Sequence, residues 1–187
     1  MPRPWTVATK SAVRRENSWG RFLRRPHAGD AIAMRDLVIE TEVLDVNSTY
    51  TYLLMATDFA DTTIVADRDG ELCGLITGYH PPHRPEVLFV WQVAVARRAQ
   101  GTGLASVMLD GLVDRVRHER HGHPVTVEAT VAPDTAASRA FFGSFARRRG
   151  VPLVEQPHFT AAQLDADGQH PDEPLLRIGP VSSPLAD

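Results

Sequence analysis

Residues 90–109 read VWQVAVARRAQGTGLASVML and join an apolar segment to a helical pattern through a turn with two glycines, Gly101 and Gly103. The apolar segment begins at Val87 and contains Gln92 as its only polar residue, which is typical of a buried central strand. Glycines at a strand-to-helix turn let the backbone fold tightly and leave the first N–H groups of the helix, about four, without intrahelical partners. The stretch therefore predicts an α/β fold with an anion-binding turn at the start of this helix.

Two familiar phosphate-binding patterns do not fit this turn. A P-loop needs Gly-Lys-Ser/Thr at the helix start, and no such triplet occurs here. A dinucleotide fingerprint needs a glycine or alanine three positions after Gly103, where Ser106 stands, and a strand that opens a βαβ unit. An alternative without a ligand stays open, in which the glycines only make a tight turn.

The residues before the long strand predict two helices and a hairpin. Apolar residues recur at helical intervals in 31–44, and 50–60 has the pattern of a second short helix. Residues 62–67 and 71–80 are strand-like, and the Asp-Gly dipeptide between them is a strong signal for a two-residue turn.

After the turn, segments with the apolar spacing of a helix alternate with segments that have the apolar spacing of a strand. We expect helices over 104–122 and 134–150, a strand over 124–132, a loop-bounded segment at 157–164 and a last short strand at 173–179. Strands that alternate with helices predict an α/β fold whose mixed central β-sheet is flanked by helices on both faces.

The composition is that of a soluble globular protein, since 43% of the 187 residues are hydrophobic and 23% are charged. We expect a single domain at 21–180, a flexible basic arm at 1–20 and a tail at 181–187. No run approaches the roughly 20 apolar residues that cross a bilayer, and the arm has no apolar signal segment. The single cysteine, Cys73, suits a reducing compartment, so we expect a cytoplasmic protein without a membrane partner.

Charge is unevenly distributed along the chain. Residues 1–30 carry +5 and the remainder −8, which gives the net charge of −3. A basic arm is able to contact nucleic acid, but this one has few aromatic residues for stacking, so we expect no nucleic-acid partner. The acidic remainder favours a cationic small-molecule ligand.

The pattern Arg/Gln-x-x-Gly-x-Gly/Ala after a strand resembles that of the N-acetyltransferases that use acetyl-coenzyme A. This resemblance implies the GNAT fold, with the turn holding the coenzyme's pyrophosphate and the preceding strand bonding its pantetheine arm, and it implies no metal. The coenzyme-binding residues that it implies are Val93, Val95, Arg98, Gln100, Gly101, Thr102, Gly103, Leu104, Ala105, Thr135 and Ser138.

The chain departs from that superfamily at two positions. Many of its members carry an asparagine at the start of the second helix block and a tyrosine seven positions later, which reprotonates the coenzyme thiolate. Thr135 and Phe142 stand at these positions. Thr135 keeps a hydroxyl group, but Phe142 has no proton to give, so the acid is unidentified.

Four blocks resemble, more narrowly, the diaminobutyrate acetyltransferases of ectoine biosynthesis. They are LDVNSTYTYLLMATDFADTTIVA at 44–66, VWQVAV at 90–95, PDTAASRAFF at 133–142 and DEPLLRIGP at 172–180. This resemblance implies acetyl transfer from acetyl-coenzyme A to the γ-amino group of L-2,4-diaminobutyrate, and a homodimer. The Asp-x-Asn-Ser-x-Tyr-x-Tyr-Leu-Leu pattern is much more specific than the coenzyme motif.

Diaminobutyrate carries one carboxylate and up to two ammonium groups, so its site needs carboxylates, a hydrogen-bonding group and an apolar wall. The residues that we expect to bind it are Asp45, Tyr50, Trp91 and Glu128, and the resemblance adds His170 and Glu173. In a simpler interpretation, Asp45 caps a turn and Trp91 lies in the core.

The expected reaction is direct attack of the amine on the thioester. An ammonium with a pKa near that of lysine, about 10.4, has no lone pair, so a carboxylate or a water relay must take its proton. Glu128 is the expected base or water-positioner, Trp91 lies with it at the reacting centre, and an N–H near Val93 should stabilise the oxyanion. In the alternative, Glu128 points outward and is only a solvated strand residue.

Two other functions remain open from the sequence. The coenzyme site is compatible with another acceptor, such as a small amine, a polyamine or a peptide N-terminus. It is also compatible with a non-catalytic acyl-coenzyme A sensor whose basic arm binds DNA.

Overall fold

The computed structural model describes residues 18–165 and 170–183. Its strands are β1 (Leu23–Arg24), β2 (Ile64–Arg68), β3 (Glu71–Tyr79), β4 (Val87–Val95), β5 (Val125–Thr130), β6 (Leu153–Phe159) and β7 (Glu173–Val181). Its α-helices are α1 (Ala31–Thr41), α2 (Thr49–Ala56), α3 (Leu104–Glu119), α4 (Ala136–Arg149) and α5 (Ala161–Leu164). Short 3-10 helices are η1 (Ser18–Phe22), η2 (Ala28–Asp30), η3 (Ala60–Thr62) and η4 (Arg97–Ala99).

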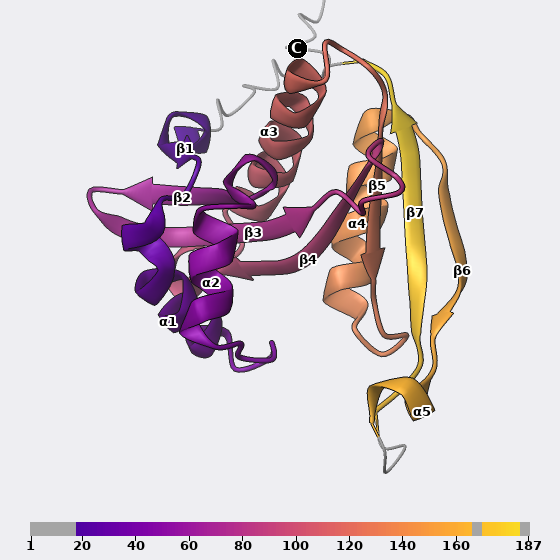
Figure 1. The fold of residues 1–187 in the computed structure, drawn as a ribbon, viewed down its shortest axis with the longest axis horizontal. Coiled ribbons are helices and arrows are strands. Elements are labelled where there is room, and N and C mark those ends of the chain that lie inside the picture. Colours follow the sequence, from indigo (N-terminus) through magenta and orange to yellow (C-terminus); the bar gives the residue numbers. More distant parts are fainter. Residues whose placement is uncertain (1–17, 166–169, 184–187) are drawn as a thin grey trace, which may run out of the picture.

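The described strands form one mixed sheet in the order β1-β2-β3-β4-β5-β7-β6 (Figure 1). All neighbours are antiparallel except β4 and β5, which are parallel. Side chains from α3 and α4 pack with one face of the sheet, and those from α1 and α2 pack with the other. The expected mixed sheet with helices on both faces is confirmed.

The strands β4 and β5 separate along their length. Their register runs from Val87 with Thr126 only as far as Phe89 with Glu128, and beyond this point no residues are paired. Figure 1 shows the two strands close at one end and apart at the other. The register of β4 against β3 also shifts beside Trp91, which is the extra residue of a β-bulge. The backbones of the parallel pair therefore diverge toward the carboxyl end of β4, and we refer to the region between these diverging backbones as the β4–β5 cleft.

The turns that the sequence predicts are present. Asp69 and Gly70, between β2 and β3, have φ values of 58° and 87°, which a two-residue hairpin turn requires. Gly150 follows α4 with a φ of 63° and accounts for the end of that helix.

The strands β1 and β6 were not predicted, and two domain boundaries fall inside structured elements. Trp19 and Gly20 belong to η1, and Val181 is 1% exposed within β7. The rest of the predicted arm and tail, residues 1–17 and 184–187, lies outside the described residues. Within the described part of the chain, no helix has both the length and the apolar character to span a bilayer.

Candidate functional site

The turn between η4 and α3 presents unpaired N–H groups. Gly101 and Gly103 have φ values of 72° and 83°, in the left-handed region that favours glycine. Within the described residues, the N–H groups of 101–106 make no hydrogen bond of ordinary geometry to protein. A Cβ at Gly101 would meet no atom within 4 Å, so space is open beside it. Unpaired amides at the start of a helix suit an anion such as a phosphate.

Trp19 and Thr102 fix the shape of this turn. Thr102 Oγ1 donates to Ala99 O at 2.6 Å and accepts from Trp19 Nε1 at 3.1 Å. These residues border a hollow of about 500 Å³, into which Arg68 and Arg98 also extend. Trp19 lies outside the predicted site residues, and nothing in the sequence distinguishes it from Trp5, the other tryptophan of the basic arm.

β4 directs main-chain groups into the cleft. Ala96 N donates to Cys73 O at 2.9 Å in the ladder with β3, and main-chain groups alternate in direction along a strand. The N–H and C=O groups of Val93 and Val95 therefore point toward the side from which β5 has diverged. Gln100 Nε2 donates to Val95 O at 3.2 Å, so this carbonyl already has one partner.

Other predicted coenzyme residues differ in what they can contribute. The Arg98 guanidinium is 3.1 Å from the Glu71 carboxylate, so its side chain is directed toward β3. The side chain of Leu104 is buried in the core, which leaves only its N–H group for a ligand. Ala105 follows it in the first turn of α3.

The start of α4 carries the remaining two predicted coenzyme residues. Thr135 is exposed, and its Oγ1 donates to Ala132 O at 2.5 Å. Ser138 is half-buried one turn later. Phe142 is 4% exposed and packs in the core, so no hydroxyl group is present at this position.

Asp45, Tyr50 and Trp91 are exposed. The exposed fraction is 69% for Tyr50 and 42% for Trp91. Ser48 is the N-cap of α2 and accepts from Thr51 N at 3.3 Å, whereas the Asp45 side chain bonds to no described residue. The alternative interpretation, with Asp45 as a turn cap and Trp91 in the core, is therefore wrong, and all three side chains are accessible to a ligand.

Gln92 positions the segment that carries Asp45. Gln92 Nε2 donates to Asp45 O at 2.8 Å, and Gln92 Oε1 accepts from Tyr52 Oη at 3.3 Å. Beside the bulge, Gln92 N donates to Thr77 Oγ1 at 3.1 Å. Sequence reasoning assigned Gln92 no role, although a single polar residue in a buried strand was the available signal.

Glu128 is fully buried at the point where β4 and β5 separate. Arg84 Nη1 donates to both of its carboxylate oxygens, at 2.8 and 2.7 Å, and Arg177 Nη1 donates to Oε1. The alternative of a solvated strand residue is therefore wrong. Its role as proton acceptor stays a prediction.

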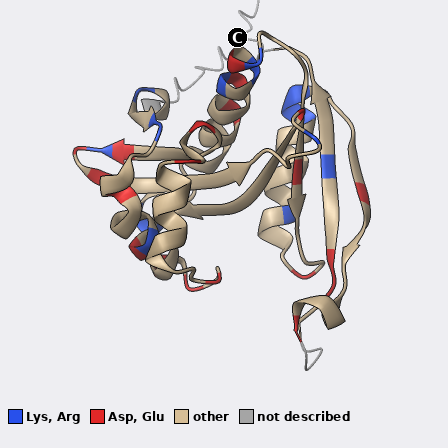
Figure 2. Ribbon diagram, viewed as in Figure 1, with Lys and Arg blue, Asp and Glu red and all other residues tan. Residues whose placement is uncertain are grey.

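Glu173 is the first residue of β7, and His170 lies three residues before it. His170 Nε2 is 3.8 Å from Glu173 Oε1, and its Nδ1 is 2.8 Å from Pro171 O. Side chains alternate along a strand, so Glu173 shares a face of the sheet with Arg177. Figure 2 shows an acidic band at the start of β7 and a basic band in its middle. This face therefore presents a carboxylate, which suits an ammonium group, and a guanidinium, which suits a carboxylate. An amino acid with a side-chain amine carries both of these groups.

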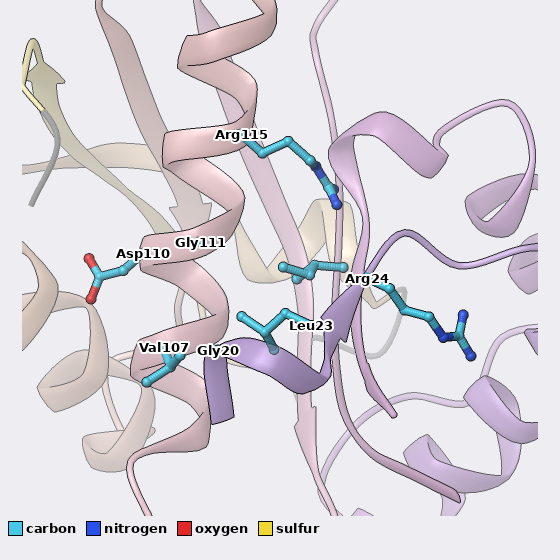
Figure 3. A pocket seen from close by; sticks show the side chains of 8 residues that line it. Gly20, Leu23, Arg24, Val107, Asp110, Gly111 and Arg115 are labelled. Carbon is cyan, nitrogen blue, oxygen red and sulfur yellow. The ribbon is translucent and has the colours of Figure 1, made fainter. Parts of the chain in front are cut away.

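A second hollow, of about 420 Å³, lies on α3 away from the cleft, between this helix and the β1 region (Figure 3). Figure 3 shows Arg24 and Asp110 directed away from each other, with Leu23 and Val107 between them. Arg24 is paired with Asp30 at 2.7 Å. The charged groups are thus already engaged, and we do not assign the active site here.

Two observations concern metal and thiol chemistry. Among the described residues, no group of three or more His, Cys, Asp or Glu side chains is arranged to hold a metal ion. Cys73 is 4% exposed, so it is a small buried residue of β3.

Comparison with known proteins adds sequence relatives. The profile of the acetyltransferase (GNAT) family matches residues 31–146. An L-2,4-diaminobutyric acid acetyltransferase of Streptomyces coelicolor is 46% identical over 161 residues, covering 85% of this chain and 92% of the relative. The protein of the same name from Nocardia farcinica is 39% identical over 183 residues, covering 97% and 88%.

A solved structure also resembles this fold. It is the diaminobutyrate acetyltransferase of Paenibacillus lautus in complex with its substrate L-2,4-diaminobutyric acid and coenzyme A. The TM-score is 0.77 at 36% identity, and the match covers 88% of this chain and 97% of the other.

Proposed function

Because the chain belongs to the acetyltransferase (GNAT) family and, within it, to the L-2,4-diaminobutyric acid acetyltransferases, we propose that it acetylates the γ-amino group of L-2,4-diaminobutyrate. The product is N4-acetyl-L-2,4-diaminobutyrate and the acetyl donor is acetyl-coenzyme A. The expected GNAT fold is confirmed. The observation that carries the proposal is the set of unpaired N–H groups at 101–106 beside the β4–β5 cleft.

The residues at the cleft fit the coenzyme. The N–H groups of 101–106 bind its pyrophosphate, and the open space beside Gly101 admits it. Val93 and Val95 bond the pantetheine arm, and Thr135 and Ser138 contact the coenzyme from α4. Acetyl-coenzyme A supplies a thioester carbonyl that is reactive toward amines. The Val93 N–H donates to the carbonyl oxygen as negative charge develops on it.

The acceptor amine lies on the side of Asp45, Tyr50, Trp91 and Glu173. The carboxylates of Asp45 and Glu173 attract the ammonium groups, and the rings of Tyr50 and Trp91 form the wall of the site. The reacting amine loses a proton to a carboxylate or water of the site, and its lone pair forms the new C–N bond as the C–S bond breaks. Phe142 has no proton to give, so the thiolate takes a proton from water or another residue, or leaves as an anion.

The test is turnover by the purified full-length chain. With acetyl-coenzyme A and diaminobutyrate, we expect release of free thiol and an NMR spectrum of the N4-acetylated product. kcat/KM should be higher for diaminobutyrate than for spermidine or a peptide. A higher kcat/KM for spermidine or a peptide would overturn the assignment of diaminobutyrate as the acceptor. Absence of thiol release with every amine would overturn the enzymatic function.

Asp45→Ala should raise KM for diaminobutyrate by about 10- to 100-fold, since a hydrogen bond to a charged group contributes about 1.5–3 kcal/mol. The dissociation constant for coenzyme A should change less than about twofold, because Asp45 precedes α2 and the coenzyme site lies at α3. Steady-state kinetics and calorimetry check these two values. Equal loss of both affinities would contradict the assignment of Asp45.

We also propose a homodimer in the cytoplasm whose product enters ectoine biosynthesis, with no nucleic-acid or membrane partner. The edge strand β6 supports the homodimer, because every one of its residues is exposed and it includes apolar Leu153, Val154 and Phe159. Exposed apolar edge strands tend to pair with another chain. Light scattering should give about twice the mass of 20.6 kDa, and a monomer at micromolar concentration would contradict the homodimer.

A further inference from the structure

Glu128 holds two guanidinium groups together at the apex of the cleft. Its carboxylate is fully buried, whereas the side chains of Arg84 and Arg177 are 43% and 40% exposed. One arginine would be enough to neutralise one buried carboxylate. The second leaves this cluster with a net charge of +1 inside a chain whose net charge is −3. The surplus charge is partly exposed and therefore available to an anion.

The two arginines keep hydrogen-bond donors free. Each bonds Glu128 through Nη1, and their Nε and Nη2 groups donate to no described residue. A guanidinium has five N–H donors in a planar fork that matches a carboxylate. The turn before β4 fixes Arg84, since its N donates to Pro81 O at 2.9 Å and its O accepts from Val87 N at 3.0 Å. The free donors are thus presented by a fixed backbone.

Glu128 and Arg177 lie in one row across the sheet with two aromatic residues of the neighbouring strands. Tyr79, Phe89, Glu128 and Arg177 are paired in register from β3 to β7, so their side chains share a face. The rings of Tyr79 and Phe89 are 5.1 Å apart and form an apolar wall beside the charges. Burial raises the pKa of Tyr79, the Arg84 charge lowers it and the Glu128 charge raises it, with a net rise. The charges of Arg84 and Glu128 therefore act on the hydroxyl group of Tyr79.

The spacing along the cleft matches the proposed substrate. Phe89 and Glu128 form the last pair before β4 and β5 separate, and Trp91 lies two residues further along β4. A regular strand would place it about 7 Å from Phe89, and the bulge at Trp91 shortens this distance. In diaminobutyrate, four bonds of about 1.5 Å join the carboxylate carbon to the γ-nitrogen, which gives about 5 Å in extended form. A carboxylate at the cluster would therefore place the γ-amine near Trp91, beside the thioester site.

We propose that Arg84 and Arg177, held together by Glu128, form the binding site for the carboxylate of the amino-acid acceptor. The proposal rests on the acetyltransferase function above and explains how the site selects an amino acid over a polyamine. A polyamine has the amines but no carboxylate, and the positive cluster repels it. Arg84 and Arg177 are then specificity-determining residues, and Glu128 is a positioning residue that acts through them.

The test compares diaminobutyrate with 1,3-diaminopropane, the same molecule without the carboxylate. In the wild-type protein, kcat/KM should favour diaminobutyrate by about 10- to 100-fold. Arg84→Gln should remove most of this preference, mainly through KM for diaminobutyrate, and change kcat/KM for 1,3-diaminopropane less than about threefold. Arg84→Lys should recover part of the preference, because it keeps the charge without the fork.

Arg25→Gln is the matched control. Arg25 is 50% exposed and also pairs with two carboxylates, Asp61 and Glu119, but none of these three belongs to the site. This variant should keep the wild-type preference. Equal loss of activity toward both amines in Arg84→Gln, or unchanged KM for diaminobutyrate, would overturn the proposal.

Calorimetry with diaminobutyrate separates this proposal from the proposed function. Binding by the wild type that weakens about 10-fold or more in Arg84→Gln supports the carboxylate site even without acetyl transfer. If the wild type acetylates diaminobutyrate and Arg84→Gln binds it with unchanged affinity, the proposed function stands and the carboxylate site is overturned. No binding of diaminobutyrate by the wild type would overturn both.

Discussion

Gly101→Val should raise the dissociation constant for coenzyme A by about 100-fold or more. The φ of 72° at this position is one that β-branched residues rarely adopt, so the turn must distort. The new side chain would also fill the open space that we propose for the pyrophosphate. Loss of two charge-assisted hydrogen bonds, at about 1.5–3 kcal/mol each, accounts for the expected factor. Isothermal titration with coenzyme A measures it.

Gly122→Val is the matched control for this experiment. Gly122 follows the other end of α3 with a φ of 80°, and a Cβ there would also meet no atom within 4 Å. Both variants should lose about 1–3 kcal/mol of stability to backbone strain. Only Gly101→Val should lose the coenzyme. Equal affinity in the two variants, whether high or low, would contradict the phosphate assignment of the turn.

The sequence predicted those elements whose pattern is set by burial. The strand at 87–95 is found with its expected bounds, because a central strand covered on both faces has a continuous apolar run. The helix predicted from 104 begins there, because two glycines precede it. β6 was missed because all of its residues are exposed and it contains Pro157, so neither alternation nor apolar content marks it.

The candidate site was predictable only where it is local in the chain. The turn at 101–103 is local, since glycine spacing alone indicates its shape. The cluster around Glu128 is not, because its partners Arg84 and Arg177 are 44 and 49 residues away. Arg177 meets Glu128 through strand register, and Arg84 reaches it from the turn before β4. No spacing rule links such residues. The sequence therefore indicated Glu128 as a base without showing the charges that surround it.

A run of arginines at the end of α4 is a second case in which contacts between distant residues are not predictable from the sequence. Here the contacts bear on stability. Arg147, Arg148 and Arg149 follow one another in the last turn of α4, and their sequence alone does not distinguish them. In the structure, the Arg149 side chain is 1% exposed, and its Nε donates to Asp110 Oδ1 at 2.8 Å. Its Nη1 donates to Asp114 Oδ1 at 2.8 Å. Arg149 therefore ties α4 to α3, the two helices that flank the cleft.

Arg149→Met should lower the free energy of unfolding by about 3 kcal/mol, the lower end of the range for breaking a buried ion pair. Asp110 and Asp114 lose their buried partner, while Arg148 still pairs with Asp110 at 3.0 Å. Burial would lower the pKa of Arg149, but its contacts with Asp114 and Asp110 give a net rise, so the folded state favours the charged form. For a protein of this size the melting temperature should fall by about 6–12 °C, measured by calorimetry. Arg147→Met, in the same run, is the control, since Arg147 is exposed and forms no ion pair with a described residue. If both variants melt alike, the tie between α3 and α4 depends on apolar packing, and the buried arginine contributes little.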